Sequence, residues 1–216
     1  MEILAPIRKL IFPAPVPPSY SYKSFPLHTL FLPTPLGSCP LFFLPHSSAT
    51  VLILFAHGNG CDIGQMHETC LYYKQQLKVH FVVFEYPGYG LFQLNNDGKQ
   101  LIPSEQSINQ IIGCILFQFI KSTLKFPLER VILFGQSIGS GPVCWIASQC
   151  NTTYKVRLGG VILQSPFTSL RNVVSDLVGS RFVASWIGEM WTNDLNLRNV
   201  REPVCIIHGR ADKSVE

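Results

Sequence analysis

The sequence predicts an α/β fold in which a mostly parallel sheet carries helices on both faces. Short, continuous apolar runs recur along the chain, and amphipathic helical segments separate most of them. A continuous apolar run is typical of a strand that is buried on both faces, whereas a strand with one solvated face alternates. Strands that alternate with helices indicate a sheet covered on both sides. With 216 residues the chain is long enough to bury the core of one domain.

The expected strands follow from these apolar runs. Two short candidates come first, His28–Leu32 and Leu41–Leu44, with a turn at Gly37-Ser38 between them. The strands that we expect to be buried on both faces are Val51–Phe55, Phe81–Phe84, Val131–Phe134, Val161–Leu163 and Val204–Ile207.

Three helices are expected between these strands. The first begins at Asp62, which forms a capping box with Gln65. Its inner face is predicted to consist of Met66, Cys70, Leu71 and Leu77. The second runs from about Ser104 to Lys121 and the third from Ile138 to about Ser148, whereas the stretch from Leu163 to about Trp191 is expected to be irregular.

Two regions do not follow this alternation of strands and helices. Residues 1–24 carry prolines among aromatic residues, which predicts an extended arm rather than a folded unit. Residues 25–216 form the predicted domain. A sheet that ends at Val204–Ile207 would expose an apolar edge, and we expect the chain to be truncated rather than naturally complete there.

Composition excludes several classes of protein. Prolines interrupt the longest uncharged stretch, so no membrane-spanning helix is predicted, and the N-terminus lacks the apolar region of a secretory signal. The net charge of +4 is spread thinly, which argues against nucleic acid as a partner. Seven cysteines without a CxxC pair favour free thiols in a reducing, cytoplasmic compartment. No nucleotide-binding glycine motif fits the sequence, and we expect neither a metal nor a cofactor.

The stretch FGQSIGSGPV contains the strongest catalytic candidate. Ser137 lies between the apolar run Val131–Phe134 and a predicted helix, with Gly135 and Gly139 two residues away on either side. This arrangement is typical of a nucleophile held on a strained turn between a strand and a helix. It also directs the amide of Ile138 toward the position of an oxyanion. The alternative is a glycine-rich turn that merely packs closely.

The turn His57-Gly58-Asn59 follows an earlier strand. Its glycine allows the backbone amide of Asn59 to serve as the second oxyanion donor. The histidine precedes Ser137 by 80 positions, whereas a triad histidine in this architecture follows both the serine and the acid. We therefore expect His57 to brace the turn together with Gly58 rather than to act as the base.

The acid and the histidine of the triad are expected to follow the serine in the sequence. Asp212 follows the last strand, where the triad acid belongs. His208 is the one histidine after Ser137, and it precedes the acid. The expected triad is therefore incomplete within these residues, and we expect its histidine to lie beyond Glu216.

These motifs resemble the serine hydrolases of the α/β-hydrolase superfamily, most closely the type-17 α/β-hydrolase-domain-containing proteins, which depalmitoylate proteins, and their protist and plant relatives. The stretches that carry the resemblance are KLIFPAPVPPSY, FAHGNGCDIGQM, EYPGYG, IPSE, ILFGQSIGSGPV, VILQSPFTSLRNV and PVCIIHGRAD. The resemblance implies the α/β-hydrolase fold, here without its final strand and histidine loop. It also implies a nucleophile at Ser137, an acid at Asp212 and oxyanion amides at Asn59 and Ile138.

The predicted function is hydrolysis of acyl thioesters or esters through an acyl-enzyme, with palmitoylated proteins as the substrates that the resemblance implies. Peripheral membrane association is a further implication, and the oligomeric state is left open. The alternatives are a general carboxylesterase or lysophospholipase, or a catalytically incomplete fragment or pseudoenzyme. Within residues 167–200, the apolar side chains between Phe167 and Trp191 suit either a small lid over an acyl chain or ordinary core packing.

Overall fold

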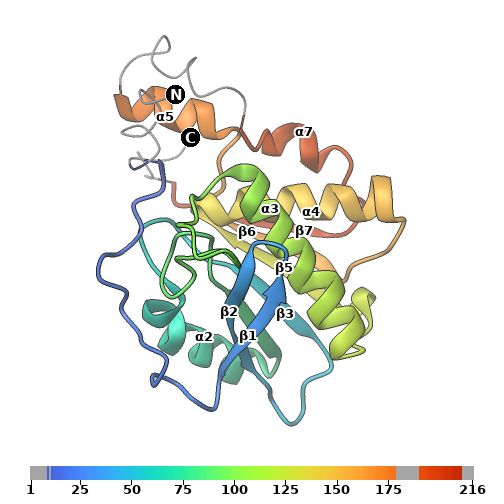
Figure 1. Ribbon diagram of the computed structural model, residues 1–216. Coiled ribbons are helices and arrows are strands. Elements are labelled where there is room, and N and C mark those ends of the chain that lie inside the picture. The colour runs from blue at the N-terminus through green and yellow to red at the C-terminus, as the bar shows by residue number, and fades with distance from the viewer. Residues whose placement is uncertain (1–8, 10, 179–189, 211–216) are drawn as a thin grey trace.

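The computed structural model describes residues 9, 11–178 and 190–210, and these form a sheet flanked by helices (Figure 1). The seven strands lie in the order β1-β2-β4-β3-β5-β6-β7. Their bounds are Thr29–Thr34, Gly37–Leu44, Leu52–Ala56, His80–Phe84, Val131–Gln136, Gly160–Gln164 and Val204–Ile207, from β1 to β7. Strand β2 pairs antiparallel with both β1 and β4, and all other pairings are parallel. The predicted mostly parallel α/β sheet is confirmed.

The helices alternate with the parallel strands, as predicted. Those described are α2 (Ile63–Leu77), α3 (Glu105–Cys114), α4 (Ser140–Gln149), α5 (Leu170–Val178) and α7 (Asn193–Leu197). The predicted capping box at the start of α2 is present, since the Asp62 side chain accepts from the Gln65 N–H and the Gln65 side chain accepts from the Asp62 N–H. Helices α3 and α4 continue as wider π-helical turns over Ile115–Thr123 and Cys150–Tyr154.

Two expectations about the helices are wrong. The stretch after Leu163 is not irregular throughout, because Leu170–Val178 forms α5 with a strongly one-sided apolar pattern. Leu77 does not line the inner face of α2, since it is 55% exposed. It occupies the last turn of the helix, and the chain then reverses at Lys78 in a left-handed conformation.

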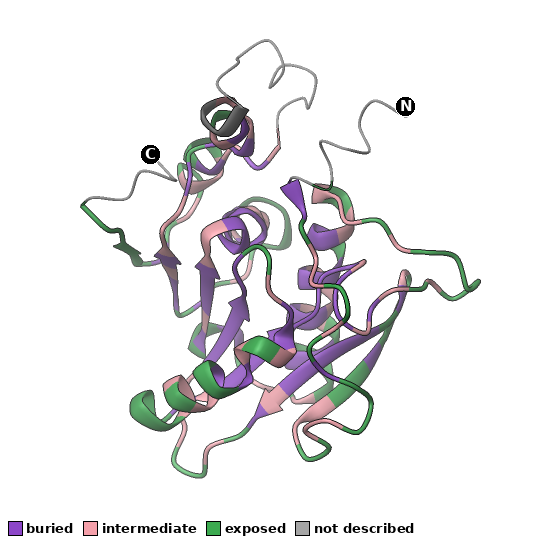
Figure 2. Ribbon diagram, turned by 90° about the vertical axis from the view of Figure 1, so that its left-hand side faces the viewer, coloured by how far each residue is buried: buried purple, intermediate pink, exposed green. Residues whose placement is uncertain are grey.

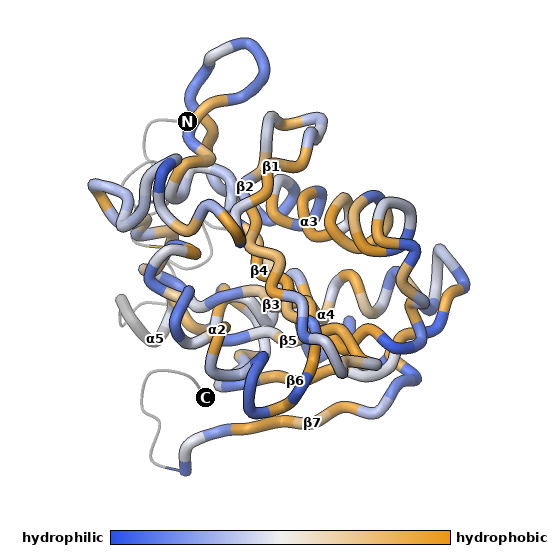
Figure 3. The backbone as a smooth tube through the Cα atoms, turned by 90° about the horizontal axis from the view of Figure 1, so that it is seen from below, coloured by the Kyte–Doolittle hydropathy of each residue, from blue (hydrophilic) through white to orange (hydrophobic). Residues whose placement is uncertain are grey.

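Successive side chains of a strand point to opposite faces of the sheet. Both faces are buried, because helices pack against each of them. Leu52 and Leu54 of β3 pack in the larger core with α3 and α4, whereas Ile53 and Phe55 pack in a second core beneath α2. Seen from below, the strands run between α2 on one side and α3 and α4 on the other (Figure 3). This two-sided burial explains why the central strands are continuously apolar.

Strand β7 forms the edge of the sheet beyond β6 (Figure 2). All four of its residues are exposed, including Val204, Ile206 and Ile207. The apolar edge that the sequence predicts is therefore present in the described residues. None of the described helices combines the length and the apolar character needed to cross a membrane.

Candidate active site

Ser137 lies directly after β5, on a short 3₁₀ turn over Ser137–Gly139 that leads into α4. Its φ angle is 51°, in the left-handed region that side chains other than glycine rarely adopt. The predicted strain at this turn is therefore present. The residue is partly exposed, whereas the side chain of Ile138 is buried and anchors the turn. This geometry lifts the hydroxyl of Ser137 out of the sheet.

The two flanking glycines are required by close contact. A Cβ atom on Gly135 would lie 2.6 Å from the carbonyl oxygen of Gly139 and 2.7 Å from the Cα atom of Ser140. A Cβ atom on Gly139 would overlap the carbonyl of Ala56 and lie 2.8 Å from that of His57. The turn that carries Ser137 therefore packs directly against the end of β3.

The predicted oxyanion turn starts at that same end of β3. Ala56 pairs with Gly135 in the parallel ladder, so residues 57–60 leave the sheet beside Ser137. Gly58 also lies against β5, because a Cβ atom there would be 3.3 Å from the side-chain oxygen of Gln136. The structure thus brings together the turns that carry the two predicted oxyanion donors, Asn59 and Ile138.

The side chain of Asn59 is fixed from several sides. Its amide nitrogen donates to the carbonyl of Ile11 at 2.6 Å, and its oxygen accepts from the Tyr89 hydroxyl at 3.0 Å and from the Gly60 N–H at 3.1 Å. Its backbone N–H, in contrast, donates to no residue that the structure describes. Asn59 as a whole is exposed.

His57 is fully buried and packs within the turn. Its ring stacks on Tyr86 with a centroid distance of 4.0 Å, and the Tyr86 hydroxyl donates to the His57 carbonyl at 2.7 Å. Its Nδ1 lies 3.0 Å from the carbonyl oxygen of Gly58. Since a carbonyl only accepts, Nδ1 carries the hydrogen of this bond. These contacts agree with the expectation that His57 braces the turn.

A buried carboxylate lies beside the other nitrogen of His57. Nε2 is 3.5 Å from Oε1 of Glu85, and both side chains are fully buried. Burial alone lowers the pKa of His57, but the side-chain contacts with Cys61 and Glu85, together with the charge of Glu85, outweigh it and raise the pKa to about 10. The raised pKa favours the imidazolium form of His57 beside the Glu85 carboxylate, with no hydrogen bond between Nε2 and Oε1.

Sequence reasoning did not identify Glu85 as part of this site. Its Oε2 accepts from the Tyr20 hydroxyl at 2.9 Å and from the Ile63 N–H at 3.2 Å. Burial, and then the charge of Glu85, raise the pKa of Tyr20, which keeps the hydroxyl a donor. An acidic residue directly after an apolar strand, in EYPGYG, was the signal that could have found it.

The remaining predicted site residue is Asp212. Asp212 falls outside the described residues, so its role as the acid stays a prediction. His208 is described; it is exposed and follows the end of β7. The chain has no histidine after His208.

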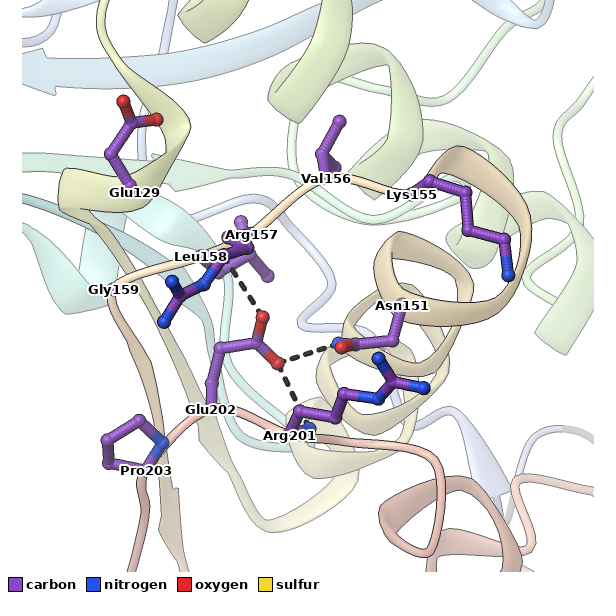
Figure 4. A pocket seen from close by; sticks show the side chains of 10 residues that line it. All are labelled: Glu129, Asn151, Lys155, Val156, Arg157, Leu158, Gly159, Arg201, Glu202 and Pro203. Atoms are coloured by element: carbon purple, nitrogen blue, oxygen red, sulfur yellow. Dashed lines mark hydrogen bonds between the residues drawn. The ribbon is translucent and has the colours of Figure 1, made fainter.

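A hollow of about 1000 Å³ lies at a different place on the molecule (Figure 4). It is lined by residues that precede β6 and β7, such as Gly159 and Pro203, and thus lies at the amino ends of these strands. Ser137 follows the carboxyl end of β5, the end at which α/β folds bind their ligands. Within the hollow, the Glu202 carboxylate accepts from the Asn151 side chain at 2.6 Å and the Leu158 N–H at 3.2 Å. We assign these residues to structure rather than to catalysis.

The described part of the predicted lid contributes to the core. Phe167, Leu170, Val174 and Trp191 are buried, and Trp191 donates from Nε1 to Asn109 at 2.9 Å. The other side chains of the predicted lid, from Leu177 to Ile187, lie outside what the structure describes. The lid therefore stays a prediction.

The sheet order, the turn at Ser137 and the adjoining glycine turn define a protein with the α/β-hydrolase fold. Solved structures with this fold include an α/β hydrolase from Vibrio vulnificus, with a TM-score of 0.66 at 16% identity over 83% of this chain and 62% of that one. A lipase/esterase from Lactobacillus plantarum gives a TM-score of 0.58 at 16% identity over 87% and 80% of the two chains. The predicted fold class is confirmed.

The relatives that match this chain include the type-17 proteins that the motifs predicted. The chain is 31% identical over 173 residues to the α/β-hydrolase-domain-containing protein aho-3 of Caenorhabditis elegans, covering 80% of this chain and 46% of that protein. It is 28% identical over 170 residues to human α/β-hydrolase-domain-containing protein 17C, covering 78% and 46%. The chain thus spans about half the length of the curated relatives it matches. No family model matches it.

Proposed function

We propose that this chain carries the nucleophile and the oxyanion site of a serine hydrolase that cleaves acyl esters or thioesters. The observation that supports the proposal most strongly is the left-handed backbone of Ser137 at the carboxyl end of β5, in contact with the turn of Asn59. Backbone strain at a residue other than glycine is typical of functional sites, such as the turn that carries a nucleophilic serine. The two turns place the Ser137 hydroxyl and the Asn59 amide at the same edge of the sheet.

In this mechanism the Ser137 hydroxyl attacks the acyl carbonyl and its proton passes to a general base. The N–H groups of Asn59 and Ile138 stabilise the oxyanion of the tetrahedral intermediate. The alcohol or thiol leaves, and water then hydrolyses the acyl-enzyme. We assign the orientation of that base to Asp212.

Palmitoylated proteins are the substrate class that we propose, because the motifs resemble those of the type-17 proteins and human protein 17C aligns with 78% of this chain. The competing proposal is a general carboxylesterase or lysophospholipase activity. It is supported by the solved lipase/esterase, which has the same fold. Turnover of palmitoyl-thioester peptides compared with short-chain esters separates the two. A preference for short esters would overturn the depalmitoylase assignment and leave the hydrolase assignment intact.

The nucleophile is tested with a fluorophosphonate probe on the full-length protein. We expect the probe to label wild-type protein at Ser137 and to leave the Ser137→Ala variant unlabelled. Ser140→Ala, three residues along the same segment, is the matched serine control and should still be labelled. Equal labelling of wild type and Ser137→Ala would refute the proposal.

A further inference from the structure

The carbonyl oxygen of Gly58 accepts two hydrogen bonds from side chains of its own turn. His57 donates from Nδ1 at 3.0 Å, and the Cys61 thiol donates at 3.1 Å. A carbonyl oxygen has two lone pairs and can accept both bonds. The two donors also lie beside each other, with 3.6 Å between the Cys61 sulfur and Nδ1.

This carbonyl shares a peptide bond with the N–H of Asn59. In a planar trans peptide the C=O and the following N–H point in opposite directions. The two bonds on the Gly58 oxygen therefore also fix the direction of the Asn59 N–H, which has no partner among the described residues. Hydrogen bonds to a carbonyl further polarise its peptide, which makes the N–H on the other side a stronger donor.

The rest of the turn is held independently of the thiol. The Tyr86 hydroxyl donates to the His57 carbonyl, and the Asn59 side chain is held by Ile11 and Tyr89. Loss of the Cys61 bond would therefore leave the turn in place and leave the Gly58 carbonyl with the His57 bond alone, which loosens the tilt of the Gly58–Asn59 peptide. A tilt of this plane moves the N–H away from the position where the oxyanion forms.

We propose that Cys61 is a positioning residue of the Ser137 site, whose thiol holds the Gly58–Asn59 peptide and so directs the Asn59 N–H toward the oxyanion. This inference rests on the proposed hydrolysis at Ser137 and adds to it a side chain that acts through the backbone. It also makes the site sensitive to thiol modification, since a capped sulfur has no hydrogen to donate. Cys61 is partly exposed.

The test compares Cys61→Ala, which removes the donor, with Cys61→Ser, which keeps one. On the full-length protein we expect Cys61→Ala to lower kcat about 10-fold with KM unchanged, which is less than the loss of a whole oxyanion donor. Cys61→Ser should stay within about 2-fold of wild type. Cys114→Ala, at a partly buried thiol on α3, is the control and should leave kcat unchanged.

A chemical measurement covers the case in which a variant folds poorly. Treatment with methyl methanethiosulfonate should lower the kcat of wild-type protein, a reducing agent should restore it, and Cys61→Ser should resist the treatment. Wild-type kcat in Cys61→Ala, or equal losses in the alanine and serine variants, would overturn the role of Cys61. Wild-type protein without turnover or fluorophosphonate labelling would instead overturn the hydrolase proposal.

Discussion

Ser137 adopts its left-handed backbone conformation at a cost that its neighbours must offset. A residue with a Cβ atom in this region is destabilised by about 1–2 kcal/mol, because Cβ approaches the following carbonyl oxygen. Gly139 permits the turn by removing a side chain at the contact with Ala56 and His57, and Gly135 by removing one at the contact with Ser140. Neither glycine relieves Ser137 itself. The strain therefore stays at the proposed nucleophile.

Two substitutions of Ser137 distinguish the effect of backbone strain on stability from the role of the hydroxyl in activity. We expect Ser137→Gly to raise the free energy of unfolding by about 1 kcal/mol, because glycine adopts a φ of 51° without a Cβ penalty. Ser137→Ala keeps the Cβ atom and should remain close to wild type in stability, while both variants lose activity. Urea denaturation measures the difference. Equal stabilities of the two variants would contradict a strained turn.

His57 gives the stability a predicted pH dependence. Its folded-state pKa of about 10 lies above the ordinary value of 6.5, so the folded state holds this proton more tightly than the unfolded state does. The stabilisation is fully present below pH 6.5 and is lost as the pH rises to about 10. We expect the free energy of unfolding of wild-type protein to fall by a few kcal/mol more over this window than that of His57→Gln. Chemical denaturation at stepped pH values measures both, and parallel curves would exclude the ion pair with Glu85.

The sequence predicted local features of the site better than its long-range contacts. Ser137, its two glycines and the turn of Asn59 are recognisable because each depends on residues within a few positions. Glu85 escaped prediction because its partners, Tyr20 and Ile63, lie 65 and 22 positions away. The role of Cys61 depends on the orientation of one peptide plane, which no residue pattern encodes.

At the scale of the elements, α2 and α3 begin in the same way but have different surroundings. Each starts with a capping box, from Asp62 in α2 and from Ser104 in α3. Asp62 is fully buried and also accepts hydrogen bonds from the N–H and the hydroxyl of Ser19 in the arm. The start of α2 therefore joins a helix to the N-terminal arm, whereas the start of α3 does not.

This difference predicts unequal effects of the two cap substitutions. Ser104→Ala should cost about 1 kcal/mol, the usual value of an N-cap. Asp62→Ala should cost about 2–3 kcal/mol, because the bonds to Ser19 are lost as well. Limited proteolysis should cut within residues 11–24 faster in Asp62→Ala only. Equal rates of cleavage in the two variants would show that Ser19 does not hold the arm.

The helices also show which features the sequence pattern predicts and which it does not. The start of α2 was predictable because its capping residues are three positions apart. Helix α5 was missed, because apolar and polar residues are mixed along the run from Leu163 to Trp191. The one-sided pattern of the helix becomes visible only once Leu170 is taken as its first residue.

For the whole molecule, continuous apolar runs predicted the central strands, but the order of the strands followed only from the structure. The position of β4 between β2 and β3 depends on pairings such as Phe42 with Val83, which link residues far apart in sequence. The antiparallel direction of β1 and β2 likewise depends on pairing rather than on composition.

The exposed edge at β7 predicts association of this 216-residue chain with itself. Ile206 and Ile207 are 58% and 53% exposed on a strand that pairs only with β6 among the described strands. Exposed apolar edges favour pairing between chains, and a charge on the edge opposes it. We expect Ile206→Lys to reduce concentration-dependent association in light scattering, with little change in unfolding. Leu27→Lys, at a 92% exposed position outside the strands, is the control, and an equal effect of both variants would rule out the edge as the cause.

The N-terminal arm has a practical consequence for anyone who produces this protein. An expression boundary placed at residue 25 would keep all seven strands and helices α2, α3, α4, α5 and α7, and the product could pass a test of secondary structure. It would nevertheless lack the Ile11 carbonyl that holds Asn59 and the Tyr20 hydroxyl that holds Glu85. Such a shortened protein would retain the α/β-hydrolase architecture while losing part of the support for the proposed oxyanion turn.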